Sequence, residues 1–357
     1  MESAMDDDLP LMSNCTRCEI CGTAAEIHQP GSFVHICQLI RLLLSPFAAF
    51  ALCLLILSLC RSNDFHKNSR LLLIFTAIFM ILANIGTFFE TTYEMFVNYV
   101  MPDDSQCDYQ IFKPQHQLIL RDFYLFGACG MALSSAALCI ERIFSAAFRK
   151  NYDNWKAFLI IGWKLVIIEI ALSLLPIYFV KPPPQSFPYS PPEVHNRRDA
   201  LHLSTALVFV NVFAIIMTIA LIYIEKNRLK KNHVTTNERL SYLKLILPLI
   251  IMIAIFVTIA HMIFLFILPD YNESTIITGK VLRELQAYAP YAEFQLTLTP
   301  IVGLLAVLII LFLAKTVRKA FINIFRRRLQ KDETTDSSRQ IYYSARPLSE
   351  VETPKII

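Results

Sequence analysis

An acidic and a basic residue, Glu141 and Arg142, stand next to each other at the end of a long apolar run. A carboxylate and a guanidinium at a helix end can pair within the protein in one state, and the guanidinium can be released towards a partner in another. Such a pair is a two-state element that a bound ligand could bias. The alternative is a structural pair whose charged groups reach the edge of an apolar layer and do nothing more.

Other polar side chains lie inside or at the ends of apolar runs, where charge is costly and is often kept for function. A pocket with apolar and aromatic walls and a few polar groups is typical of small-molecule recognition. Packing between helices is the alternative for each of these side chains. The candidates for ligand binding are Glu90, Tyr93, Arg121, Asp122, Tyr124, Asn211, His261 and Glu293.

The elements that carry these residues are seven long apolar runs. A helix needs about 20 residues to cross a bilayer core of about 30 Å, and each run reaches that length. Barrel strands would alternate in polarity, which these runs do not. We therefore predict an all-α membrane protein, a seven-transmembrane helix bundle. Its spans are expected at residues 36–60, 71–89, 118–140, 157–180, 201–224, 243–268 and 291–314.

Composition supports a membrane protein. Of the 357 residues, 55 % are apolar and 17 % are charged, against roughly 25 % charged residues in ordinary soluble domains. These values exclude a disordered chain and a nucleic-acid-binding domain, so no nucleic-acid partner is expected. They also argue against a soluble enzyme.

The loops predict an orientation. Lysine and arginine residues are concentrated on one side of the predicted bundle, and the basic side is the cytoplasmic one. This places the N-terminus outside and the C-terminus inside. The N-glycosylation sequons at Asn14 and Asn272 both fall on the predicted outer side. The first residues show no cleavable apolar stretch, so we expect the first span to act as the insertion signal.

Cysteines cluster on the predicted outer side, where the environment is oxidising. We expect a disulfide between Cys107 and one of Cys15, Cys18, Cys21 or Cys37, and the sequence does not choose among the four. The N-terminal cysteines could instead suggest a metal site, but a closed zinc site needs a fourth ligand that is not evident. We expect no metal and no cofactor.

The chain divides into four segments. Residues 1–35 form an extracellular segment, 36–314 the bundle, 315–330 an amphipathic juxtamembrane helix, and 331–357 a disordered cytoplasmic tail. The basic face of the juxtamembrane helix is expected to meet anionic membrane lipids. Phosphorylation of serines and threonines in the tail could recruit a desensitising partner.

The stretch SSAALCIERIFSAAFRKNYD, residues 134–153, resembles the third-span signature of the nematode serpentine chemoreceptors. In that signature Glu-Arg is followed by small residues and then Tyr-Glu. Here Tyr152 is the tyrosine, and Asp153 stands where glutamate is usual. The stretch FHKNSRLLL, residues 65–73, is similar to the first inner loop of the same group. Serpentine receptor class alpha/beta is the closest match, with class alpha and the related classes b and e as neighbours.

This resemblance implies a chemosensory G-protein-coupled receptor. Its partners would be an external small molecule and a heterotrimeric G protein, and its location the plasma membrane of a sensory neuron or its cilium. The coupling residues would be Glu141, Arg142 and Tyr152.

Two other functions would leave different patterns in the sequence. A seven-span transporter or channel subunit without G-protein coupling would predict internal repeats or glycine-interrupted spans. A seven-span hydrolase would need several histidines with acidic residues near one face. The sequence shows neither pattern, so we predict a receptor and not an enzyme.

Overall fold

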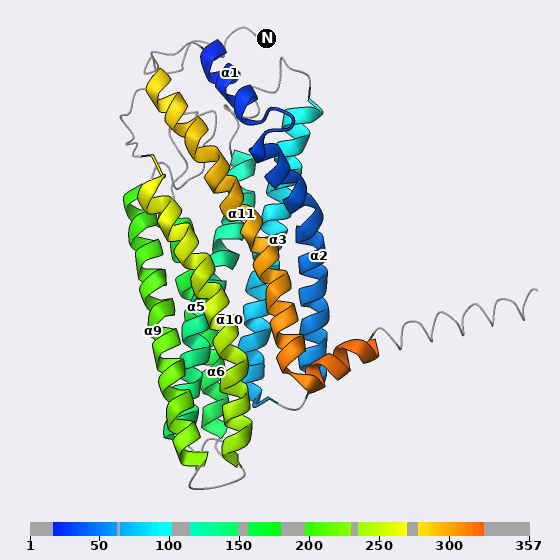
Figure 1. The fold of residues 1–357 in the computed structure, drawn as a ribbon, viewed down its shortest axis with the longest axis vertical. Coiled ribbons are helices and arrows are strands. Elements are labelled where there is room, and N and C mark those ends of the chain that lie inside the picture. The colour runs from blue at the N-terminus through cyan, green and yellow to red at the C-terminus, as the bar shows by residue number, and fades with distance from the viewer. Residues whose placement is uncertain are drawn as a thin grey trace, which may run out of the picture.

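The computed structural model describes residues 17–62, 65–101, 115–148, 156–179, 197–229, 235–269 and 278–324. These residues are helical and form no strand. The helices bundle side by side, with α1 lying across one end (Figure 1). In chain order they are α1 (Arg17–Ile27), α2 (Phe33–Arg61), α3 (Lys67–Tyr99), α5 (Gln115–Ala147), α6 (Lys156–Ser173), α7 (Leu175–Phe179), α9 (Arg197–Leu229), α10 (Thr235–Phe266) and α11 (Gly279–Leu313).

Seven of these segments are long and apolar enough to cross a membrane, which confirms the predicted seven-helix bundle. Arg41 and Arg142 lie at opposite ends of the bundle, which are called the Arg41 end and the Arg142 end. The Arg41 end holds the start of α2 and the end of α3, and the Arg142 end holds the end of α5 and the start of α10.

The structure differs from the sequence prediction in three places. The fourth run, predicted as one helix over 157–180, is interrupted at Leu174 and divides into α6 and α7. Pro176 lies two positions later, and a proline cannot donate the backbone hydrogen bond that an unbroken helix needs there. Helices α3 and α11 extend well beyond the predicted spans at the Arg41 end, and α1 was not predicted.

Helices α3 and α5 approach each other closely through glycines. A Cβ atom on Gly127 would lie 2.4 Å from the backbone nitrogen of Ala83, and one on Gly86 would lie 2.5 Å from that of Tyr124. Only glycine fits at such separations, as is typical of helix pairs in membranes. This close contact fixes α5, which carries Arg121 at one end and Arg142 at the other.

The outward faces are apolar, as a lipid environment requires. Large side chains such as Phe209, Phe266 and Phe312 are about 70 % or more exposed. Helix α9 is the least covered of the long spans, with 22 % of its span buried. It therefore forms the edge of the bundle in Figure 1.

Residues 315–324 form a further helix that turns away from α11 after Ala314 (Figure 1). Val317 and Ile324 are buried, whereas Lys315, Arg318 and Lys319 are exposed. This division between an apolar and a basic face is the one expected of an amphipathic helix at a membrane surface.

Candidate functional site

Glu141 and Arg142 form an ion pair with each other in this structure. Glu141 is fully buried and Arg142 is 7 % exposed. The Arg142 guanidinium donates hydrogen bonds to the Glu141 carboxylate and to the hydroxyl of Ser69 on α3. Ser69 in turn donates to both carboxylate oxygens of Glu141 at 3.2 Å. The pair is therefore tied to a second helix, which a snorkelling surface pair would not be.

A third helix joins this arrangement through an aromatic ring. The guanidinium carbon of Arg142 lies 4.4 Å from the ring centroid of Tyr242 on α10. A cation over an aromatic face is attracted by the ring quadrupole, by about 2 kcal/mol when it is desolvated. We call Ser69, Glu141, Arg142 and Tyr242 the latch, because they connect α3, α5 and α10.

Beside the latch lies a small cavity lined by Arg142 and by Glu225 of α9. Glu225 is 1 % exposed. Its Oε1 accepts a hydrogen bond from Arg228 at 3.3 Å, and its Oε2 has no partner among the described residues. A second carboxylate thus lies within the surroundings of Arg142, with one acceptor oxygen unused.

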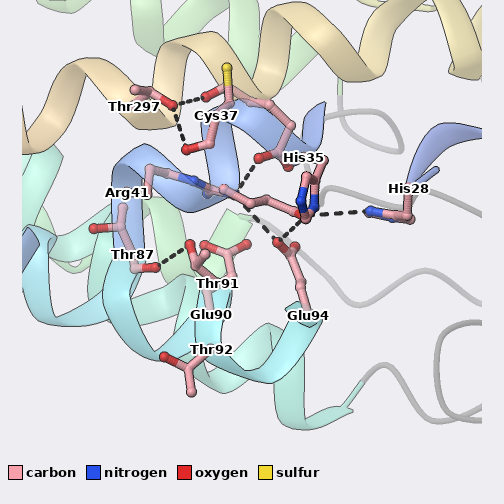
Figure 2. A network of polar contacts seen from close by, with 12 residues as sticks. His28, His35, Cys37, Arg41, Thr87, Glu90, Thr91, Thr92, Glu94 and Thr297 are labelled. Carbon is pink, nitrogen blue, oxygen red and sulfur yellow. Dashed lines mark hydrogen bonds and ion pairs between the residues drawn. The ribbon is translucent and has the colours of Figure 1, made fainter. Parts of the chain in front are cut away.

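The Arg41 end holds a buried ionic network. Arg41 is fully buried, and its Nη2 lies close to Glu94, to which it donates at 3.3 Å (Figure 2). The same Nη2 also donates to Glu293. Gln38 also donates to Glu94, at 3.2 Å. These contacts connect α2, α3 and α11, and they compensate charges that a membrane interior would otherwise penalise heavily.

A second ion pair lies on the neighbouring helices. Arg121 on α5 donates to Glu90 on α3 at 2.7 Å, and both side chains are buried. The guanidinium of Arg121 also lies 5.7 Å from the ring centroid of Tyr124. The Arg41 network and the Arg121–Glu90 pair together connect α2, α3, α5 and α11, so their role is structural.

His28, which lies between α1 and α2, contacts the network from outside the spans. Its Nδ1 lies 3.3 Å from Nε2 of Gln38. Burial, and secondarily the positive charge of Arg41, lowers the pKa of His28 from 6.5 to about 4. The imidazole is therefore neutral at physiological pH and accepts the hydrogen bond.

We expect acid to weaken this end of the molecule. The folded state disfavours the protonated imidazole, so the stability due to the neutral ring is complete above pH 6.5 and is lost as the pH falls towards 4. At 1.36 kcal/mol per pKa unit the loss at pH 5 is about 2 kcal/mol. The thermal midpoint of the solubilised protein should fall more between pH 7.5 and pH 5 in the parent than in His28→Asn. The exposed His202→Asn is the control and should behave like the parent; equal falls in the parent and His28→Asn would contradict the assignment.

A larger cavity, of about 320 Å³, opens between α5, α7, α9, α10 and α11. It lies in the half of the bundle nearer to the Arg41 end. Most of its wall is apolar, including Cys129, Leu207, Phe256 and Phe264. Its polar lining residues are Tyr124, Asp199, His202, Ser204 and Gln295.

Comparison with known proteins identifies the family. Residues 18–345 match the family described as the serpentine type 7TM GPCR receptor class ab chemoreceptor. The chain belongs to this family. No curated protein matches the chain. The predicted membership among the serpentine chemoreceptors is thereby confirmed, and the receptor is a multi-pass membrane protein of a chemosensory class.

Of the predicted ligand-binding residues, Tyr124 lines the large cavity of the receptor. Glu90, Arg121 and Glu293 are instead held in the ion pairs between helices. The Asn211 amide donates to the backbone of Ala132 and of Leu207, at 3.2 and 2.8 Å. These four side chains therefore contact neighbouring helices, which is the alternative to ligand binding stated above.

Of the remaining candidates for ligand binding, His261 lies next to the cavity, whereas Tyr93 and Asp122 do not. The His261 Nδ1 lies 3.0 Å from the hydroxyl of Ser204, a lining residue, so His261 borders the cavity through that serine. Tyr93 and Asp122 are half-buried on α3 and α5 and are not among the described lining residues. Tyr152, the third predicted coupling residue, lies outside the described residues.

The predicted ligand-binding candidates did not include Gln295, Asp199 or His202, which line the cavity, and Arg41 was not predicted as the centre of the network. An arginine within an apolar run was a usable signal for Arg41, because a buried guanidinium must be paired. Nothing comparable marks a neutral amide such as Gln295.

The structure describes some of the receptor's cysteines. Cys21 is disulfide-bonded, and Cys37 is a buried free thiol. The Cys37 alternative for the predicted disulfide is therefore not the one that forms. Cys15, Cys107 and the sequons at Asn14 and Asn272 lie outside the described residues.

Proposed function

We propose that this receptor binds an external small molecule in the 320 Å³ cavity and activates a heterotrimeric G protein at its Arg142 end. The Arg41 end would face the outside of the plasma membrane, and residues 315–324 would lie on the cytoplasmic lipid surface. The observation that supports this most is the latch. Arg142 is held by three helices while an unused buried acceptor, on Glu225, lies beside it.

The cavity and the latch share helices. Tyr124 and Phe256 line the cavity from α5 and α10, and the same two helices carry Arg142 and Tyr242 at their other ends. A ligand that favours a different spacing of α10 and α5 would therefore weaken the contact of the Tyr242 ring with the guanidinium. Such a ligand shifts the equilibrium only by its differential affinity for the two arrangements.

On release, the Arg142 guanidinium would exchange one buried carboxylate partner for another. Turning away from Glu141, the guanidinium would meet Oε2 of Glu225 across the small cavity. That exchange keeps the Arg142 guanidinium paired in both states, and Glu141 keeps the hydrogen bond from Ser69, which reduces the free-energy difference between the two states. The surface vacated between α5, α9 and α10 would be open to the G protein. A desensitising partner would bind later, at the phosphorylated tail of residues 331–357.

Replacing Glu141 by glutamine is expected to raise signalling without ligand. The amide keeps the shape but weakens a charge-assisted hydrogen bond, which is worth about 1.5–3 kcal/mol. The equilibrium should then shift by about 10- to 100-fold towards the released state. Second-messenger production in cells expressing Glu141→Gln at parental surface levels checks this. Glu169→Gln, a buried carboxylate bonded to Ser134 away from the latch, is the control. Basal signalling equal to that of the parent would contradict the latch as a restraint.

A further inference from the structure

The polar groups that line the 320 Å³ cavity differ in whether they already have hydrogen-bond partners or contact with water. The Ser204 hydroxyl contacts His261 at 3.0 Å and donates to the carbonyl of Leu201 at 3.1 Å. Asp199 and His202 are exposed at the start of α9, where water reaches them. These three residues leave little unmet hydrogen-bonding capacity inside the cavity.

Gln295 is the exception. Its side chain is 8 % exposed, lines the cavity from α11, and has no hydrogen-bond partner among the described residues. Its amide is accessible from the cavity, so its hydrogen-bonding capacity is open to a molecule that enters there. Gln295 therefore presents one donor group and one acceptor to whatever occupies the cavity.

Among the described lining residues only Asp199 is acidic or basic by type at neutral pH, and it is exposed at the start of α9. The buried carboxylate of Glu90 is already paired, with Arg121 at 2.7 Å. A charged ligand would lose its hydration in the apolar part of the cavity without gaining a buried counter-ion. The walls thus favour an uncharged molecule.

The volume indicates the size of that molecule. A water molecule takes about 30 Å³ in the liquid, so 320 Å³ accommodates about ten groups of that size. We propose that the cavity binds an uncharged, mostly apolar molecule of about ten non-hydrogen atoms, whose single hydrogen-bonding oxygen pairs with the Gln295 amide. This inference rests on the proposed function and names the ligand class for its site.

The test uses four probes of matched length: 2-octanone, octane, octanoate and octylamine. Each is titrated against the purified full-length receptor in lipid nanodiscs, and its affinity is taken from the rise in thermal midpoint. We expect 2-octanone to bind more tightly than the other three. Tighter binding of octanoate or octylamine, or no stabilisation by 2-octanone, would overturn the proposal without any variant being needed.

Variants assign the hydrogen bond. Gln295→Leu should weaken 2-octanone binding by about tenfold and leave octane binding unchanged, since one hydrogen bond of about 1.4 kcal/mol corresponds to a factor of ten. Gln295→Met serves if the leucine variant folds poorly. Gln286→Leu makes the same change at a half-buried position of α11 that does not line the cavity, where the amide donates to Glu26, and this variant should bind as the parent does. Because partitioning into the lipid is common to all variants, an unchanged affinity in both Gln295 variants would overturn the role of the amide.

Failure of this inference can be told from failure of the proposed function. Binding of 2-octanone that depends on Gln295, with no nucleotide exchange on any G protein, would preserve the ligand class and reject the coupling. Nucleotide exchange by Glu141→Gln, with octanoate or octylamine bound more tightly than 2-octanone, would preserve the coupling and reject the ligand class.

Discussion

Replacing Arg142 by alanine is expected to abolish G-protein activation while the receptor still reaches the cell surface. The guanidinium is the group that the latch holds in one state and that the proposed exchange moves in the other. Alanine provides neither arrangement, so signalling should fall to the level of untransfected cells. The measurement is second-messenger production normalised to surface receptor, and Arg61→Ala is the matched control. Arg61 is exposed and lies at the end of α2, at the same end of the bundle.

One complication of this variant can be removed by design. Deleting Arg142 leaves the buried Glu141 carboxylate uncompensated, which costs about 3–5 kcal/mol when the charge cannot reach water. The double variant Glu141→Gln/Arg142→Ala removes that charge and should fold like the parent. Signalling by the double variant at the level of Glu141→Gln would show that Arg142 is dispensable for coupling.

Replacing Arg41 by methionine is expected to remove the receptor from the cell surface. Arg41 is fully buried and bonds two carboxylates, Glu94 and Glu293, from two other helices. Its loss leaves both carboxylates uncompensated, and breaking a buried ion pair costs about 3–5 kcal/mol. Since proteins are stable by only about 5–15 kcal/mol, little folded receptor should remain. Surface labelling and the thermal midpoint of the solubilised protein measure the effect.

A triple variant separates charge from packing at the same site. Arg41→Met with Glu94→Gln and Glu293→Gln removes all three charges together, and such replacement of a whole buried network is often neutral or stabilising. We expect it to restore surface expression to near the parental level. A triple variant as poorly expressed as Arg41→Met would show that the shape of the arginine, and not its charge, holds this end together.

The sequence was sufficient to predict the seven spans because hydrophobicity over about 20 residues is a local property. It also predicted that Glu141 and Arg142 pair, because the two residues are neighbours in the chain. The partners of Arg41 were not predictable in this way, since Glu94 and Glu293 lie 53 and 252 positions away. Which residues meet depends on how the helices are rotated and shifted against each other, and hydropathy does not determine that.

The ligand-binding candidates show the same limit of prediction from the sequence. A charge within an apolar run indicates that a partner exists, but the partner can be a ligand or another helix. For Glu90, Arg121 and Glu293 the partner is another helix. The residue with unmet hydrogen-bonding capacity in the cavity, Gln295, is a neutral amide two positions from Glu293. Only the packing of the surrounding helices distinguishes it.

Coupling at the Arg142 end is the central proposal, and one measurement tests it without a known ligand. Parent receptor, Glu141→Gln and Glu141→Gln/Arg142→Ala are reconstituted in nanodiscs, and guanine-nucleotide exchange is followed on purified heterotrimeric G proteins of each Gα class. We predict that Glu141→Gln accelerates exchange on at least one class, by about tenfold or more over the parent, and that the double variant does not. Equal exchange rates for all three proteins on every class would contradict it.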